Sequence, residues 1–136
     1  MAHNIKKAPA GVAAESVGML AAANGGPIRL YNGAQPATGG GTITTQVLIA
    51  ELVAGYPAGD VPGGDGTVAY RPVTADADTD AGTPTWFRQF ATDGTTPLYD
   101  GTVGVGTGYD LNIDSLPLAL HSTLTLTSGS YKSNPG

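Results

Sequence analysis

Residues 85–103 read TWFRQFATDGTTPLYDGTV, and this stretch decides the fold class. Aromatic and β-branched residues on both sides of the Asp-Gly pair at residues 93–94 are typical of a β-hairpin. Alternate residues of a strand point to opposite faces, so Trp86 and Phe90 share one face while Phe87 lies on the other. We expect one of these aromatic faces to lie in a hydrophobic core. The stretch therefore predicts an antiparallel β-protein.

The segments on either side of this hairpin repeat the pattern. Short runs rich in β-branched and aromatic residues alternate with clusters of Gly, Pro and Asp, as they do in all-β domains. Because no helical pattern follows residue 27, we expect an antiparallel β-sandwich of the jelly-roll or Ig-like type. The predicted strands are residues 28–31, 44–53, 67–73, 85–92, 98–103, 110–113 and 120–127.

The N-terminal part of the chain differs from the rest. Residues 1–11 are predicted to form a polar arm, and residues 12–23 carry apolar side chains at helical spacing. Asn24 and the two glycines after it are a helix stop signal. We therefore divide the chain into residues 1–26, an arm with a short helix, and residues 27–136, a β-sandwich domain that we expect to fold by itself.

Composition excludes several classes of function. The chain has 136 residues, a net charge of −5 and only six Lys and Arg, so it lacks the basic surface that direct nucleic-acid binding needs. It has no Cys, which excludes disulfides and thiolate metal sites. No run of about 18 apolar residues occurs, so we expect no membrane span. Charged residues make up only 12 % of the chain, which favours broad protein contacts.

Three aspartates at alternate positions, Asp76, Asp78 and Asp80, form the one candidate metal site in the sequence. Alternate carboxylates in a loop can converge on Ca²⁺. However, the sixth and twelfth positions of this loop hold Ala81 and Phe87 in place of the Gly and Glu of an EF-hand. A solvated turn explains the same pattern, and we assign no metal and no cofactor.

The sequence contains no recognisable catalytic motif. The two histidines are His3, in the arm, and His121, on the polar face of a predicted strand, where an exposed or interface position is the simpler interpretation. The glycine clusters lack the Lys-Ser/Thr of a phosphate-binding loop and are interpreted as turns. We therefore predict that the protein is not an enzyme. An enzyme acting on a cell-envelope polymer remains the weakest alternative, supported only by the number of aspartates.

Several sequence segments together resemble a group of small virion proteins of tailed bacteriophages. The segments are IRLYNGAQPAT (28–38), LIAEL (48–52), TWFR (85–88), DGTT (93–96), DGTVG (100–104) and DLNI (110–113). The resemblance covers about residues 27–128 and implies a structural component of the virion, in particular a capsid decoration or cement protein that binds the major capsid protein. The N-terminal segment and residues 56–66, a predicted surface loop, depart from that pattern.

A decoration protein needs a rigid body and a means of attachment. We expect the N-terminal arm to be the tether, with Lys6 and Lys7 binding an acidic shell surface. The resemblance also implies a homo-oligomer, with a trimer as one form. The alternative is a tail or neck component, including a receptor- or glycan-binding module in which Trp86 or Tyr109 stacks on a sugar.

Overall fold

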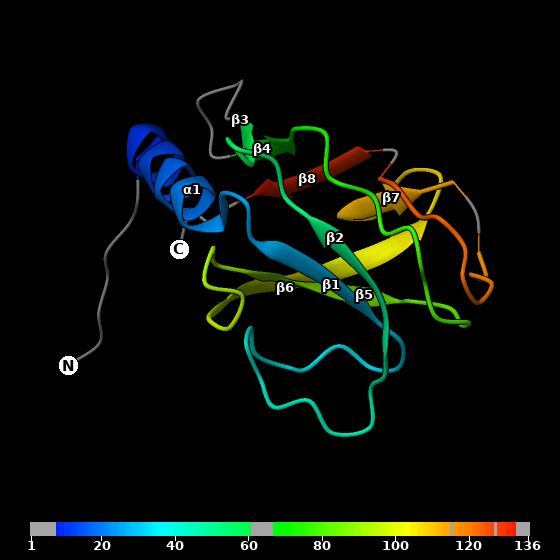
Figure 1. Cartoon of the computed structure of the whole chain (residues 1–136). Coiled ribbons are helices and arrows are strands. Elements are labelled where there is room, and N and C mark those ends of the chain that lie inside the picture. Colours follow the sequence, from blue (N-terminus) through cyan, green and yellow to red (C-terminus); the bar gives the residue numbers. More distant parts are fainter. Residues whose placement is uncertain (1–7, 61–66, 115, 127, 133–136) are drawn as a thin grey trace.

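The computed structural model describes residues 8–60, 67–114, 116–126 and 128–132. In these residues one helix, α1 (Pro9–Ala23), precedes eight strands (Figure 1). The strands are β1 (Pro27–Tyr31), β2 (Leu48–Val53), β3 (Gly59–Asp60), β4 (Thr67–Tyr70), β5 (Trp86–Phe90), β6 (Pro97–Val105), β7 (Leu111–Ile113) and β8 (Ser128–Lys132).

The strands form one curled sheet in the order β2-β1-β5-β6-β7-β8-β4-β3. Because the sheet curls, side chains from both of its ends meet in one core, where Ile28 and Leu52 join Val68 and Leu111. The mostly-β prediction is confirmed. The prediction of a purely antiparallel sheet is wrong, because β6 and β7 are parallel.

The parallel pair is made by a very short connection. β7 pairs only with the last three residues of β6, from Val103 to Val105. The connection therefore has to return only to the level of Val103 before β7 begins. Parallel neighbours ordinarily need a connection of a dozen or more residues. Here Gly106 and Gly108 take positive φ angles of 91° and 96°, which permit the sharp reversal.

The predicted helix is confirmed and is longer than expected. Pro9 begins it, as its fixed φ favours, and Gly25 follows its end with a φ of 66°. Residues 9–11 are therefore helical and do not belong to an arm, and residues 1–7 lie outside the described part of the chain. Leu20 and Ala23 pack into the same core as the strands.

The predicted hairpin is confirmed. β5 pairs antiparallel with β6, with Trp86 opposite Thr102 and Arg88 opposite Asp100. The burial of β5 differs from the prediction. One buried face was expected, but all five residues of the strand are buried. On the second face, Trp86 and Arg88 contact the connection between β1 and β2, at Asn32 and Gly41.

The predicted strand at residues 120–127 is wrong. Leu118 and Leu124 form only isolated bridges to Gly82 and Asp76, and the last strand, β8, begins at Ser128. The reason is a turn at His121, whose φ is 60° and whose backbone N–H donates to the Thr79 carbonyl oxygen. Regular alternation of Leu with polar residues does not reveal such a turn.

Two further strands are shorter than predicted. Residues 44–47 were predicted to belong to β2 but lie before it, and residues 71–73 were predicted to belong to β4 but lie after it. Within the predicted loop 56–66, Gly59 and Asp60 form β3, and residues 61–66 lie outside the described part. Among the described residues, no helix combines the length and the apolar character that a membrane span requires.

Candidate functional site

The main candidate site is the loop of residues 32–47, which we call the clamped loop. It leaves β1, projects from the lower end of the molecule in Figure 1 and returns to β2. Its two ends are joined by the Asn32 N–H, which donates to the Val47 carbonyl oxygen over 3.1 Å, and the Val47 N–H, which donates to Asn32 Oδ1 over 2.7 Å. Gln46 Nε2 also donates to the Ala34 carbonyl oxygen. The loop is therefore closed at its base.

A buried ion pair holds the middle of the clamped loop, at Gly40 and Gly41. Arg88 Nε lies 2.7 Å from Asp100 Oδ1, and these side chains are only 6 % and 2 % exposed. Arg88 Nη2 donates to the Gly41 carbonyl oxygen over 2.8 Å, and Asp100 Oδ2 accepts from the Gly40 N–H over 3.3 Å. The hydrogen bond to Asp100 raises the pKa of Arg88 above its ordinary value, against the effect of burial. Each member of the pair thus holds one residue of the loop.

Aromatic side chains form the floor beneath the clamped loop. The rings of Tyr31 and Trp86 stack with centroids 4.7 Å apart, and Trp86 Nε1 donates to the Asn32 carbonyl oxygen. Trp86 is 1 % exposed, so its ring is not presented to a sugar. Tyr109, the other residue of the glycan hypothesis, is 45 % exposed, and its ring lies against Gly104.

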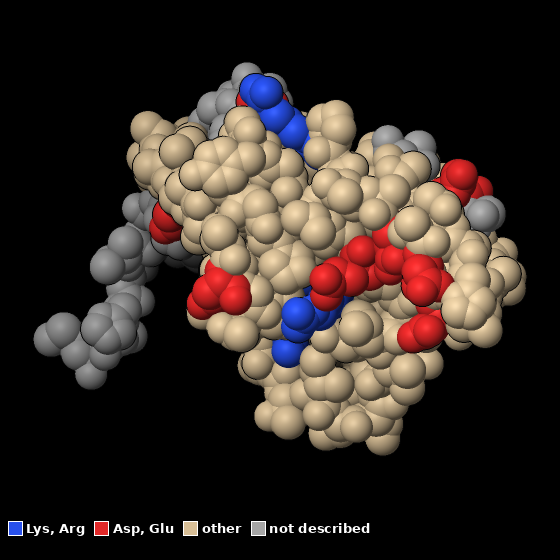
Figure 2. Space-filling model, in the orientation of Figure 1, with Lys and Arg blue, Asp and Glu red and all other residues tan. Residues whose placement is uncertain are grey.

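The outer surface of the clamped loop carries no charge. Residues 30–50 contain no Asp, Glu, Lys, Arg or His. Exposed positions of the loop present methyl, hydroxyl, amide and backbone groups, and Val47 beside β2 is 54 % exposed. Figure 2 shows this lower end of the molecule without red or blue side chains.

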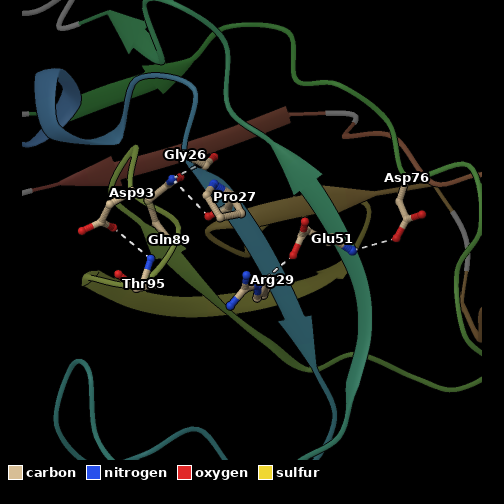
Figure 3. A network of polar contacts seen from close by, with 8 residues as sticks. All are labelled: Gly26, Pro27, Arg29, Glu51, Asp76, Gln89, Asp93 and Thr95. Atoms are coloured by element: carbon tan, nitrogen blue, oxygen red, sulfur yellow. Dashed lines mark hydrogen bonds and ion pairs between the residues drawn. The ribbon is translucent and has the colours of Figure 1, made fainter.

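Residues 74–80, which contain the three aspartates, pair with β2 through hydrogen bonds. Asp76 Oδ2 accepts from the Glu51 N–H over 2.7 Å, as Figure 3 shows, and Asp76 Oδ1 accepts from the Asp78 N–H. The Asp80 N–H donates to the Ile49 carbonyl oxygen, and Thr74 exchanges two hydrogen bonds with Val53. Residues 74–80 therefore cover the outer edge of β2.

This arrangement does not bring Asp76, Asp78 and Asp80 together as metal ligands. Among the described residues, no group of three or more His, Asp or Glu is placed to hold a metal ion. Asp78 pairs with Nδ1 of His121. His121 is exposed, as the sequence indicated.

The predicted cationic tether, Lys6 and Lys7, lies outside the described residues. All three arginines of the chain are described, and each forms an ion pair with a carboxylate. The Arg29 guanidinium, for example, contacts Glu51 and lies 4.6 Å from the centroid of the Phe90 ring. The described basic side chains thus already have acidic partners within the chain.

Two surface hollows lie away from the clamped loop. One, of about 210 Å³, is lined by Tyr70, Arg71, Pro72, Val73, Thr125, Leu126, Ser128 and Gly129. The other, of about 310 Å³ and mostly apolar, is lined by Val17, Leu20, Ala21, Asn24, Pro57, Gly59 and Asp60. Neither of these linings combines a nucleophile with a base or places two carboxylates together, as hydrolytic catalysis requires.

The sequence did not predict that Arg88 and Asp100 bind the clamped loop. Arg88 and Asp100 are direct cross-strand partners, so the predicted hairpin contained a signal for their pairing. Their contacts with Gly41 and Gly40 join residues 47 and 60 positions apart and have no signal in the sequence.

Comparisons of the chain with protein-family models, with curated proteins and with solved structures find no match.

Proposed function

We propose that the chain is a non-enzymatic structural protein of a tailed-bacteriophage particle, a capsid decoration protein that binds the major capsid lattice and stays on the virion. The sequence resemblance supports this proposal. It is also supported by the charged side chains, which bind the backbone of loops within the chain. The ion pair of Arg88 and Asp100 and the carboxylates of Asp76 and Asp93 hold loops in place. We also propose that the curled sheet is a form of β-sandwich.

The observation that carries the proposal is the clamped loop. An exposed loop of 16 residues ordinarily samples many conformations, and ordering it costs entropy on binding. Here hydrogen bonds at its base and a buried ion pair that contacts its middle order it in advance. A rigid, uncharged surface of this kind suits adhesion to a protein lattice.

The N-terminal lysines are the second element of the proposal. Lys6 and Lys7 precede α1 and supply positive charge to a chain whose net charge is −5. They would add electrostatic attraction to an acidic capsid surface.

The test is binding to purified phage heads that lack this protein. Replacement of both lysines, Lys6→Ala with Lys7→Ala, is expected to lower occupancy about tenfold and to reduce its salt dependence. The matched control is Lys132→Ala, which removes one positive charge near the other end of the chain. Failure of the unchanged protein to bind heads would refute the decoration role, and full binding by the double variant would refute the tether alone.

A further inference from the structure

Two tyrosines from distant strands meet inside the curled sheet. Tyr70 is the last residue of β4 and Tyr99 lies in β6, and β7 and β8 separate these two strands in the order of the sheet. Because the sheet curls, the hydroxyls of Tyr70 and Tyr99 nevertheless form a hydrogen bond with each other. Two strands that do not pair through their backbones are therefore in contact through their phenol groups.

A buried glutamine fixes the direction of this hydrogen bond. Gln89 is fully buried, and its Nε2 donates to the Phe90 carbonyl oxygen over 2.8 Å. The amide oxygen is turned towards the tyrosines, and the Tyr70 hydroxyl donates to Gln89 Oε1 over 3.4 Å. Because Tyr70 has a single hydroxyl proton, Tyr99 is the donor in the hydrogen bond between the two tyrosines.

The two tyrosines differ in their access to solvent. Tyr70 is only partly buried, and with Leu126 and Gly129 it lines the hollow of about 210 Å³. Tyr99 is buried, and its ring meets the Phe87 ring edge-on with centroids 6.1 Å apart. A small oxidant therefore reaches the pair at Tyr70, from the hollow. The chain contains no Cys whose thiol would be oxidised first.

Hydrogen-bonded phenols are well placed for oxidative coupling. Coupling takes place at the ring carbon next to the one that bears the hydroxyl, so contact between the two oxygens also brings the reacting carbons near each other. Each phenol gives up one electron and one proton, a carbon–carbon bond forms between the rings, and the hydrogen displaced from each coupled carbon restores a hydroxyl. Hydrogen peroxide takes up the two electrons and two protons, its oxygen–oxygen bond breaks, and two water molecules form.

We propose that Tyr70 and Tyr99 are an oxidative cross-linking site, at which a peroxide converts the pair to dityrosine and joins β4 to β6 covalently. The inference goes beyond the proposed virion role and does not depend on it. The cross-link closes the chain between residues 70 and 99 into a loop. It restricts the unfolded chain as a disulfide does, and so stabilises the folded protein.

The experiment treats a dilute solution of the full-length chain with hydrogen peroxide and a haem peroxidase. We expect dityrosine fluorescence from a chain of monomer mass that has lost two hydrogen atoms, and a higher urea midpoint after the reaction. Proteolysis after Arg88, which lies between the two tyrosines in the sequence, is expected to leave them joined in one cross-linked peptide. Absence of dityrosine would overturn the proposal, as would dityrosine found only in covalent dimers.

Phenylalanine substitutions identify the residues that react. Tyr70→Phe and Tyr99→Phe each keep the ring but remove the hydroxyl, and each is expected to abolish the cross-link within the chain. A cross-link that persisted in either folded variant would overturn the assignment. Circular dichroism and thermal unfolding show whether each variant is folded, and Tyr70→Phe, at the partly buried position, gives the test if Tyr99→Phe does not fold.

The matched control is Tyr56→Phe combined with Tyr109→Phe, which removes two exposed tyrosines. This double variant is expected to form the cross-link within the chain as the original protein does. Loss of the cross-link in the double variant would show that the exposed tyrosines are the ones that react, and would refute the proposal.

Discussion

At the scale of single residues, Arg88 and Asp100 are the most consequential pair in the described part of the chain. The guanidinium fork matches the carboxylate, with two contacts of 2.7 Å and 3.0 Å, and both groups make a further hydrogen bond to the clamped loop. Burying two charges is costly, and good geometry with extra hydrogen bonds offsets that cost. The pair therefore specifies one loop conformation more than it adds net stability.

Removing one member of this pair is expected to be strongly destabilising. Arg88→Ala leaves the Asp100 carboxylate buried without its cation, which lowers the free energy of unfolding by about 3–5 kcal/mol. The control is Arg29→Ala, which breaks the partly exposed pair with Glu51 and costs about 1 kcal/mol or less. Urea denaturation measures both, and equal losses would contradict the assigned importance of the buried pair.

Asp93, in the β5–β6 turn, makes a separate contribution that depends on pH. Hydrogen bonds from the Thr96 hydroxyl, the Thr96 N–H and the Thr95 N–H lower the pKa of Asp93 from 3.8 to about 2. The folded state therefore binds this proton less readily than the unfolded chain does. The stabilisation is full above about pH 4 and is lost as the pH falls towards 2.

The matched variant for this prediction is Asp93→Asn, which keeps a side-chain oxygen but does not ionise. The difference in Tm between the original protein and the variant is expected to be largest above about pH 4 and to shrink as the pH falls to about 2. Thermal unfolding followed at several pH values measures it. A difference that stayed constant over this range would show that the Asp93 charge has no part in the turn.

At the scale of elements, α1 belongs to the core of the sheet. Val12, Ser16, Leu20 and Ala23 form its buried side, and a Leu20 methyl group packs close to Gly59 of β3. The sequence suggested that residues 27–136 would fold alone, because helix and strand patterns are separated at residue 26. Because Leu20 and Ala23 pack in the common core, we expect residues 27–136 alone to be less stable than the whole chain.

Deletion of residues 1–23 is expected to destabilise the sheet by several kcal/mol, because it removes Leu20 and Ala23 from the core that they share with Ala58 and Val68. Deletion of residues 1–7 retains the whole helix and is the control. Chemical denaturation of both truncated chains measures the effect. A chain lacking residues 1–23 that unfolded cooperatively at an unchanged urea midpoint would show that α1 is dispensable.

At the scale of the whole molecule, local features were predictable and distant contacts were not. Trp86 to Val103 lie on one continuous hairpin, so strand period and an Asp-Gly turn sufficed to predict it. The turn at His121 was missed because a non-glycine residue with positive φ has no periodic signature. The clamp on Gly41 was missed because Arg88 reaches it across 47 positions of sequence.

Segment 74–80 has a consequence for how neighbours can attach to the sheet. Glu51 N–H donates to Asp76, and Val53 exchanges hydrogen bonds with Thr74, so these backbone groups of β2 have no free capacity to recruit an extended peptide from another protein. On this side the molecule resists fibril-like stacking.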